Sequence, residues 1–147
     1  MLTLRDSPAF YNWLTDGDDI QRRQDDLVSG LVFDVENNDL WRDGWGTRPE
    51  TVEGRLARVS ELTNAAPRLI PVFSHRYLLA EPCQASNPLF SIVQSDIIIY
   101  GADLRTYFLH EFADLLGIES DKARTLTSAM IQARYSTYGQ IPFWRAC

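Results

Sequence analysis

Three groups of residues in this chain could do chemistry, and the first is the run His110-Glu111-Phe112-Ala113-Asp114. On a helix, His110 and Asp114 would share one face, with Glu111 between them as a possible base. This is half of the helical motif that binds zinc in metalloproteases. The second histidine of that motif is missing, and His75 is the only other histidine in the chain. We therefore expect no metal site and interpret the run as the polar face of a helix.

The second group is His75-Arg76-Tyr77, which lies beside runs of strand-forming residues. Imidazole, guanidinium and phenol groups can all bind anions or carboxylates, so this run could line a ligand pocket. The alternative is a structural hub, in which Arg76 pairs with a carboxylate such as Asp96 or Asp34 and ties strands together. A buried arginine needs such a partner, and we favour the hub.

The third group is Asp96 itself, which precedes three consecutive isoleucines. A carboxylate beside a buried run can have a raised pKa and act as a base. No second carboxylate at a recognisable spacing accompanies it, and the chain has no nucleophile paired with a base and no glycine-rich phosphate loop. We therefore expect Asp96 to bind Arg76 or a backbone amide, and we expect neither an enzyme nor a cofactor.

Surface contacts with another protein are the remaining possibility. Trp41, Trp45 and Trp144 could be exposed contact residues, because tryptophan is enriched at binding hot spots. Packing at the edge of the core is the alternative, and for Trp45 it is the stronger one. The charged segment 16–26 is either a solvated helix face or an acidic surface that meets a basic partner.

The composition narrows the class of protein. The chain has 147 residues, 45% of them hydrophobic and 23% charged, which predicts one globular domain over residues 1–147. No apolar run approaches the ~20 residues that span a bilayer, and the N-terminus lacks the plan of a signal peptide, so we expect a cytoplasmic protein with no membrane partner. A net charge of −6 disfavours nucleic acid and favours a basic protein partner.

The elements that must position these residues follow from periodicity and from capping signals. In the first half we expect a helix over 9–15 that starts at Ser7-Pro8 and ends at 16–19, followed by a short exposed helix over 20–29. We then expect a strand over 31–35, and a helix that is capped by Thr47 with Glu50 and ends near Asn64. In the second half we expect strands between 69 and 100, of which 89–93 and 97–100 would be buried on both faces. After them we expect a helix over 103–116 stopped by Gly117, a helix capped by Ser120 that runs to about Tyr135, and a packed tail over 141–144. Strands gathered in the middle with helices at the ends predict an α+β domain.

The order of several motifs carries a family resemblance. These motifs are Trp41…Trp45-Gly46-x-Arg48-Pro49, then Ala66-Pro67-x-Leu69-Ile70-Pro71-Val72-x-x-His75-Arg76-Tyr77, then Asn87-Pro88-Leu89-Phe90-Ser91-Ile92-x-Gln94-x-Asp96-Ile97-Ile98-x-Tyr100-Gly101-x-Asp103-Leu104. In this order they resemble bacterial members of the Smi/Knr family, which belongs to the SUKH superfamily. The resemblance covers roughly residues 31–112. The N-terminus departs from the family, because Ser7-Pro8-Ala9-Phe10 and Asp16-Gly17 match its opening helix and turn only loosely.

The resemblance implies an α+β domain with a central, largely antiparallel sheet flanked by helices. It also implies a function without catalysis, since many bacterial members resemble immunity proteins that neutralise a toxin, often a nuclease. Fungal relatives resemble regulatory scaffolds linked to cell-wall synthesis, which gives a second hypothesis. A metal-dependent hydrolase built on the histidines is a third, of low weight.

From the sequence we therefore predict a protein-binding domain of the immunity type, with a basic toxin domain as partner. The residues that we expect to form either a binding site or a structural hub are Trp41, Trp45, His75, Arg76, Tyr77, Asp96 and Tyr100.

Overall fold

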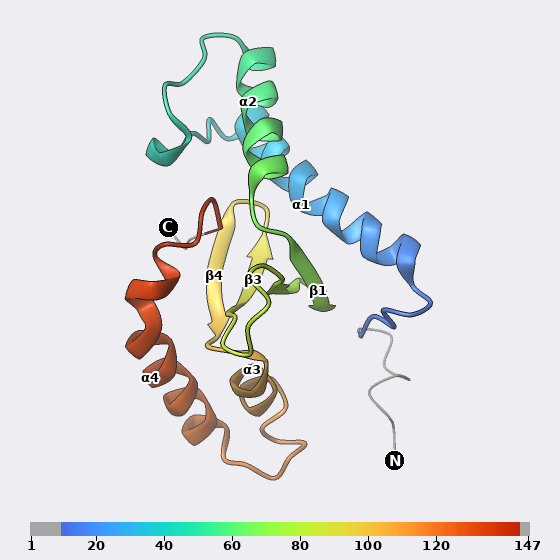
Figure 1. Cartoon of the computed structure of the whole chain (residues 1–147), viewed down its shortest axis with the longest axis vertical. Helices are drawn as coiled ribbons and strands as arrows, with labels where there is room; N and C mark the ends of the chain where they lie inside the picture. The colour runs from blue at the N-terminus through green and yellow to red at the C-terminus, as the bar shows by residue number, and fades with distance from the viewer. Residues whose placement is uncertain (1–9, 145–147) are drawn as a thin grey trace.

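The computed structural model describes residues 10–144, and Figure 1 shows their arrangement. Along the chain the elements are α1 (Gly17–Asn37), the short 3-10 helix η2 (Asp43–Trp45), α2 (Val52–Ala65), β1 (Leu69–Phe73), β2 (Arg76–Leu79), β3 (Leu89–Val93), β4 (Asp96–Gly101), α3 (Leu104–Glu111) and α4 (Ser120–Tyr138). The predicted α+β class is confirmed. None of the described helices is both long enough and apolar enough to cross a membrane.

The four strands form one antiparallel sheet in the order β1-β2-β3-β4. Helices α1 and α2 pack together near the end of the sheet where β3 turns into β4, and α3 and α4 lie towards the other end (Figure 1). Successive side chains of a strand point to opposite faces, so each strand contributes to two apolar clusters. Tyr77 and Leu79 belong to one cluster, and Leu78, between them, packs on the other.

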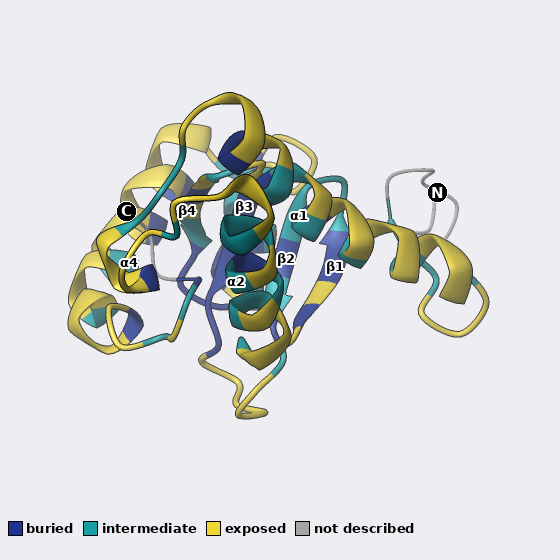
Figure 2. Cartoon of the chain, turned by 90° about the horizontal axis from the view of Figure 1, so that it is seen from above, coloured by how far each residue is buried: buried dark blue, intermediate teal, exposed yellow. Residues whose placement is uncertain are grey.

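The two apolar clusters differ in size. The larger one contains Leu27, Leu31, Val35, Trp45, Val59, Leu69, Tyr77, Leu79, Phe90, Ile92, Ile97 and Trp144. The smaller one contains Val72, Leu89 and Tyr107, with Phe73, Leu78, Tyr100, Leu104, Phe108 and Phe112 packed around them. The first joins α1, α2 and the C-terminal tail to one face of the sheet, and the second joins α3 to the other. Figure 2 shows the strands buried beneath exposed helical surfaces.

The prediction of a strand over 31–35 is wrong, because these residues belong to α1. Leu27, Leu31 and Val35 are spaced by four residues and all are buried, so they form the core-facing stripe of a helix. The β-branched residues of the segment favoured a strand locally, but burial of this stripe against the sheet determines the outcome. The short exposed helix predicted over 20–29 is the first part of the same helix.

The prediction of an N-terminal helix over 9–15 is also wrong, because residues 10–15 are not helical. The predicted helix start at Ser7-Pro8 lies outside the described residues. Phe10 instead forms an isolated antiparallel bridge with Phe73 of β1. The acidic run 16–19, expected to end a helix, begins α1. Asp18 and Asp19 lie in its first turn, where negative charge is favourable.

Three helix boundaries differ from prediction. Thr51, and not Thr47, caps α2 by accepting a hydrogen bond from the N–H of Gly54 at 3.1 Å, since Pro49 keeps the chain before it extended. Helix α3 follows its cap Asp103, close to the predicted start at 103, but it ends at Glu111 and not at 116 because the chain then folds into turns. Helix α4 runs to Tyr138 and follows Glu119, so Ser120 is not its cap.

Two further predictions concern burial. Strand β3 is buried on both faces over 89–92, as expected, but β4 is not: Ile97 is buried and Ile98 is 46% exposed. The C-terminal tail packs back on the domain as predicted. Trp144 is buried, and its indole N–H donates to the carbonyl of Pro67 at 2.7 Å.

Gly101 at the end of β4 tests how closely α3 packs on the sheet. A Cβ added there would lie 2.8 Å from the Cβ of Tyr107 and 3.1 Å from the carbonyl oxygen of Asp103. We predict that Gly101→Ala lowers the free energy of unfolding by about 1–3 kcal/mol, as overpacking does elsewhere. Denaturant unfolding measures it. Gly17→Ala is the control, since a Cβ there meets nothing within 4 Å, and equal stability of both variants would contradict the packing.

Candidate functional site

Six polar and aromatic residues gather between the sheet and α3, and we call them the Arg76 cluster. Its members are His75, Arg76, Tyr100, Tyr107, His110 and Glu111. The turn after β1 supplies one residue, β2 and β4 supply one each, and α3 supplies three. The sequence analysis singled out every one of these residues except Tyr107 as a candidate or as part of a motif, but did not predict that α3 would bring them together.

Arg76 is the centre of the cluster, and its side chain is only 11% exposed. One terminal nitrogen lies 3.6 Å from Oε2 of Glu111, and the other donates to the hydroxyl of Ser91 at 2.8 Å and contacts His75. The guanidinium carbon lies 3.8 Å from the ring centroid of Tyr100, which adds a cation–π contact. Arg76 therefore ties β2, β3, β4 and α3 together.

The predicted partners of Arg76 were wrong. Asp96 is exposed at the start of β4. Asp34 is buried in α1, where its carboxylate accepts hydrogen bonds from the N–H of Ser95 and the side chain of Asn38. The partner is Glu111, because α3 packs on the face of the sheet to which Arg76 points.

Several polar atoms of the cluster are buried without a hydrogen-bond partner among residues 10–144. They are Nε of Arg76, the hydroxyl of Tyr107, Nδ1 of His110 and Oε2 of Glu111. Arg76 and Glu111 form an ion pair, so the cluster is polar but electrically balanced. The ring of His110 stacks on the ring of Tyr100 with centroids 4.9 Å apart, and it covers one side of the Tyr100 ring.

The electrostatics leave the cluster without an activated nucleophile. Burial, with the neighbouring charge of Arg76, lowers the pKa of His75, so this imidazole is neutral at physiological pH. Burial, together with Glu111, raises the pKa of Tyr100 and that of Tyr107, so both phenols keep their protons. These contacts fit the structural hub better than a catalytic centre.

Two other predicted site residues lie away from the cluster. Tyr77 points to the opposite face of the sheet, because neighbouring strand residues alternate. Its hydroxyl donates to the carbonyl of Arg23 in α1 at 3.4 Å, and burial raises its pKa to about 12. Asp96 lies at the exposed tip of the β3–β4 hairpin, away from both the Arg76 cluster and Tyr77.

The tryptophans form a second region, on the face covered by α2. Trp45 is 4% exposed, with its ring 5.5 Å from that of Trp41 in an edge-on contact and stacked 5.9 Å from Phe143. Trp41 is half-buried, and its indole N–H donates to the carbonyl of Gly46 at 2.9 Å. Trp45 and Trp144 are therefore core residues and not exposed contacts.

Beside this aromatic group is a pocket of about 780 Å³. Its lining consists of Arg42, Asp43, Gly44, Trp45, Leu62, Ala65, Ala66, Gly139, Gln140, Ile141, Pro142 and Phe143. No motif in the sequence indicated this pocket, although the apolar tail over 141–144 was a signal that the C-terminus folds back on the domain.

The polar side chains of the run 110–114 are directed to different partners. Glu111 faces Arg76, and Asp114 accepts a hydrogen bond from the hydroxyl of Ser120 at 2.5 Å. Within the described part of the chain, no three His, Cys, Asp or Glu side chains are grouped as metal ligands.

Comparison of the chain with protein-family models, with curated proteins and with solved structures found no match. The resemblance to the Smi/Knr family stays a prediction from the motifs.

Removal of Glu111 tests the hub. Glu111→Ala leaves the mostly buried charge of Arg76 unpaired, and we predict a loss of about 2–4 kcal/mol in the free energy of unfolding. The double variant Arg76→Met/Glu111→Leu should recover part of the loss, because it leaves no unpaired charge. Glu61→Ala is the control: it removes the exposed pair with Arg58 and should cost at most about 1 kcal/mol. Denaturant unfolding of all three decides the point.

The pH dependence of stability tests His75. Its pKa is lowered in the folded protein, so the unfolded chain binds the proton more readily, and folding loses stability as the pH falls below the ordinary value of 6.5. We predict that His75→Gln weakens this dependence, so that the variant gains on the wild type between pH 7.5 and pH 5. A stability difference that stays constant over this range would contradict the shift.

Proposed function

We propose that this chain is a protein-binding domain without catalytic activity, which binds a basic protein domain and neutralises it as an immunity protein does. The observation that carries the proposal is an acidic projection with exposed apolar side chains next to it. We call it the acidic arm and define it as residues 13–26.

The acidic arm combines charge with apolar contact area. It holds five aspartates and two arginines, a net charge of −3 against −6 for the whole chain. Trp13 is 54% exposed and Leu14 is 89% exposed, both in the turn before α1. Apolar surface beside exposed charge suits an interface in which the apolar part excludes water and the charge steers the partner.

Part of the charge is free for a partner. Asp19 pairs with Arg22 at 2.9 Å and Asp26 with Arg23 at 3.7 Å, whereas Asp18 has no ion pair among residues 10–144. The first turns of α1 extend beyond the sheet and are almost wholly exposed, as Figure 2 shows.

The acidic arm is nonetheless held in place. The indole N–H of Trp13 donates to the carbonyl of Pro71 at 2.9 Å, and the side-chain amide of Gln24 donates to the carbonyl of Leu69 at 3.1 Å. Both contacts are on β1, the edge strand of the sheet. A preordered arm loses little conformational entropy on binding, which favours a tight complex.

A complex of ordinary size would bury on the order of 1,600 Å² in total. The acidic arm would lie over cationic residues of the partner, and these are the groups that a nuclease uses to bind phosphates. Occlusion of such a surface blocks the partner without any chemistry by this chain. A regulatory adaptor would use the same arm on an endogenous protein, and the partner's identity separates the two.

Charge reversal tests the proposal. With the tagged protein as bait, we predict capture of a basic protein, and Asp18→Lys/Asp25→Lys should lower the affinity at least tenfold in calorimetry at low salt. Glu36→Lys/Glu50→Lys changes the net charge equally at exposed positions outside the arm and is the control.

Coexpression then separates the two biological roles. If the captured protein is toxic and the wild-type chain restores growth, the immunity role holds. If the captured protein is a harmless endogenous protein, the chain is instead a regulatory adaptor. An acidic or neutral partner, or equal losses in both variants, would contradict the proposal.

A further inference from the structure

The pocket beside Trp45 has a distinctive arrangement of backbone charge. Helices α2 and α4 both end at it: Ala65 is the last residue of α2, and Gly139 follows the last residue of α4. The carboxyl end of a helix carries partial negative charge. At α4 the carbonyls of Tyr135, Thr137 and Tyr138 accept hydrogen bonds from residues 139–141, so most of the free carbonyls at the pocket belong to α2. Neither helix has a basic residue in its last turn to offset this charge.

The charged side chains near the pocket leave a negative balance. Asp43 is exposed and has no ion pair within the described residues. Arg42 is the one cation of the lining, but its guanidinium donates to the carbonyl of Ser95 and lies near the buried carboxylate of Asp34. An additional cation is therefore favoured at the open side of the pocket.

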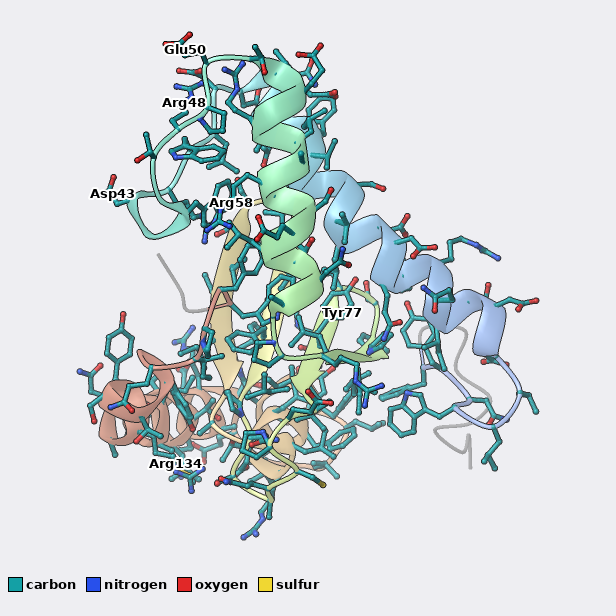
Figure 3. All side chains as sticks on the ribbon, turned by 45° about the horizontal axis from the view of Figure 1, so that its top comes forward. Asp43, Arg48, Glu50, Arg58, Tyr77 and Arg134 are labelled. Atoms are coloured by element: carbon teal, nitrogen blue, oxygen red, sulfur yellow. The ribbon has the colours of Figure 1, made fainter. Side chains whose placement is uncertain are left out.

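The charge of Arg58, which lies close to the η2 loop, is also neutralised. Arg58 donates to the carbonyl of Trp45 at 3.2 Å and pairs with Glu61 at 2.7 Å. Figure 3 shows Asp43 extending outward from the η2 loop, with Arg58 lying further inward.

The rest of the lining is apolar or small. Leu62, Ile141 and Phe143 supply aliphatic and aromatic surface, and Ala65 and Gly139 leave room between them. Apolar walls with an anionic rim suit the side chains of arginine and lysine, whose methylene stems pack on apolar surface while the charged head stays at the rim. The volume lies within the range of ordinary ligand pockets and admits one such side chain with its neighbours.

We propose that this pocket binds an arginine or lysine side chain from an exposed loop of a basic protein partner. The inference rests on the proposed function for the source of the side chain, but its chemistry is testable without that partner. The acidic arm would supply long-range attraction, and the pocket would seat one specific side chain.

The first experiment uses small probes. The ¹⁵N-labelled protein is titrated with acetyl-Gly-Arg-Gly-amide, and separately with the Glu and Leu versions of the same peptide. We predict saturable shifts of the amides of Gly44, Gly139 and Gln140 with the Arg peptide, at millimolar affinity, and none with the Glu peptide. Equal binding of the Leu peptide, or shifts confined to the acidic arm, would overturn the proposal.

Two variants make the test specific. Asp43→Lys should weaken binding of the Arg peptide by about three- to tenfold, since the charge is exposed and screened. Ala65→Lys should abolish it by placing a cation in the pocket, while leaving the protein at least as stable, because lysine suits a helix carboxyl end. Asp18→Lys in the acidic arm is the control and should leave peptide binding unchanged.

The same variants keep this proposal distinct from the proposed function. If a captured partner loses affinity with the arm variants but not with Asp43→Lys or Ala65→Lys, the pocket is wrong and the protein-binding function stands. If the Arg peptide binds the pocket but no basic partner is captured, the pocket stands and the proposed partner is wrong.

Discussion

The contact between α1 and the β3–β4 turn is the constraint on which the rest of the structure depends. Oδ2 of Asp34 accepts a hydrogen bond from the N–H of Ser95 at 3.0 Å, and Gly30 brings the helix close, since a Cβ there would lie 3.0 Å from Cα of Gln94. Burial alone would raise the pKa of Asp34, but the hydrogen bonds from Ser95 and Asn38 hold it below its ordinary value. A buried carboxylate that stays ionised fixes the register of the helix on the sheet.

That one contact positions both surfaces to which we assign function. Because α1 is a single helix of 21 residues, anchoring one part of it at the hairpin directs its other end outward past β1, where the acidic arm begins. Arg42 donates to the carbonyl of the same residue, Ser95, so the hairpin also holds one wall of the pocket. The Arg76 cluster joins α3 to the opposite face and contributes rigidity rather than recognition.

The strands between 69 and 100 and the helices that became α2, α3 and α4 could be located from the sequence, because β-branched runs, turn residues and apolar helical stripes leave strong local signals. Prediction from the sequence failed where tertiary packing overrides local preference. The segment 31–35 has strand-like composition, yet it is helical because Leu27, Leu31 and Val35 form one buried stripe. The candidate residues His75, Arg76 and Tyr100 do meet, but their partner Glu111 lies far along the chain and depends on how α3 docks. The pocket could not be predicted, since it needs three segments that only the folded chain brings together.

The central claim is that this domain binds a basic protein through the acidic arm and the pocket beside Trp45. Hydrogen–deuterium exchange of the chain, free and in complex with its captured partner, tests this most directly. We predict added protection at residues 13–26 and at 139–143, with no change at the Arg76 cluster. Protection centred on the Arg76 cluster, with the acidic arm unaffected, would contradict it.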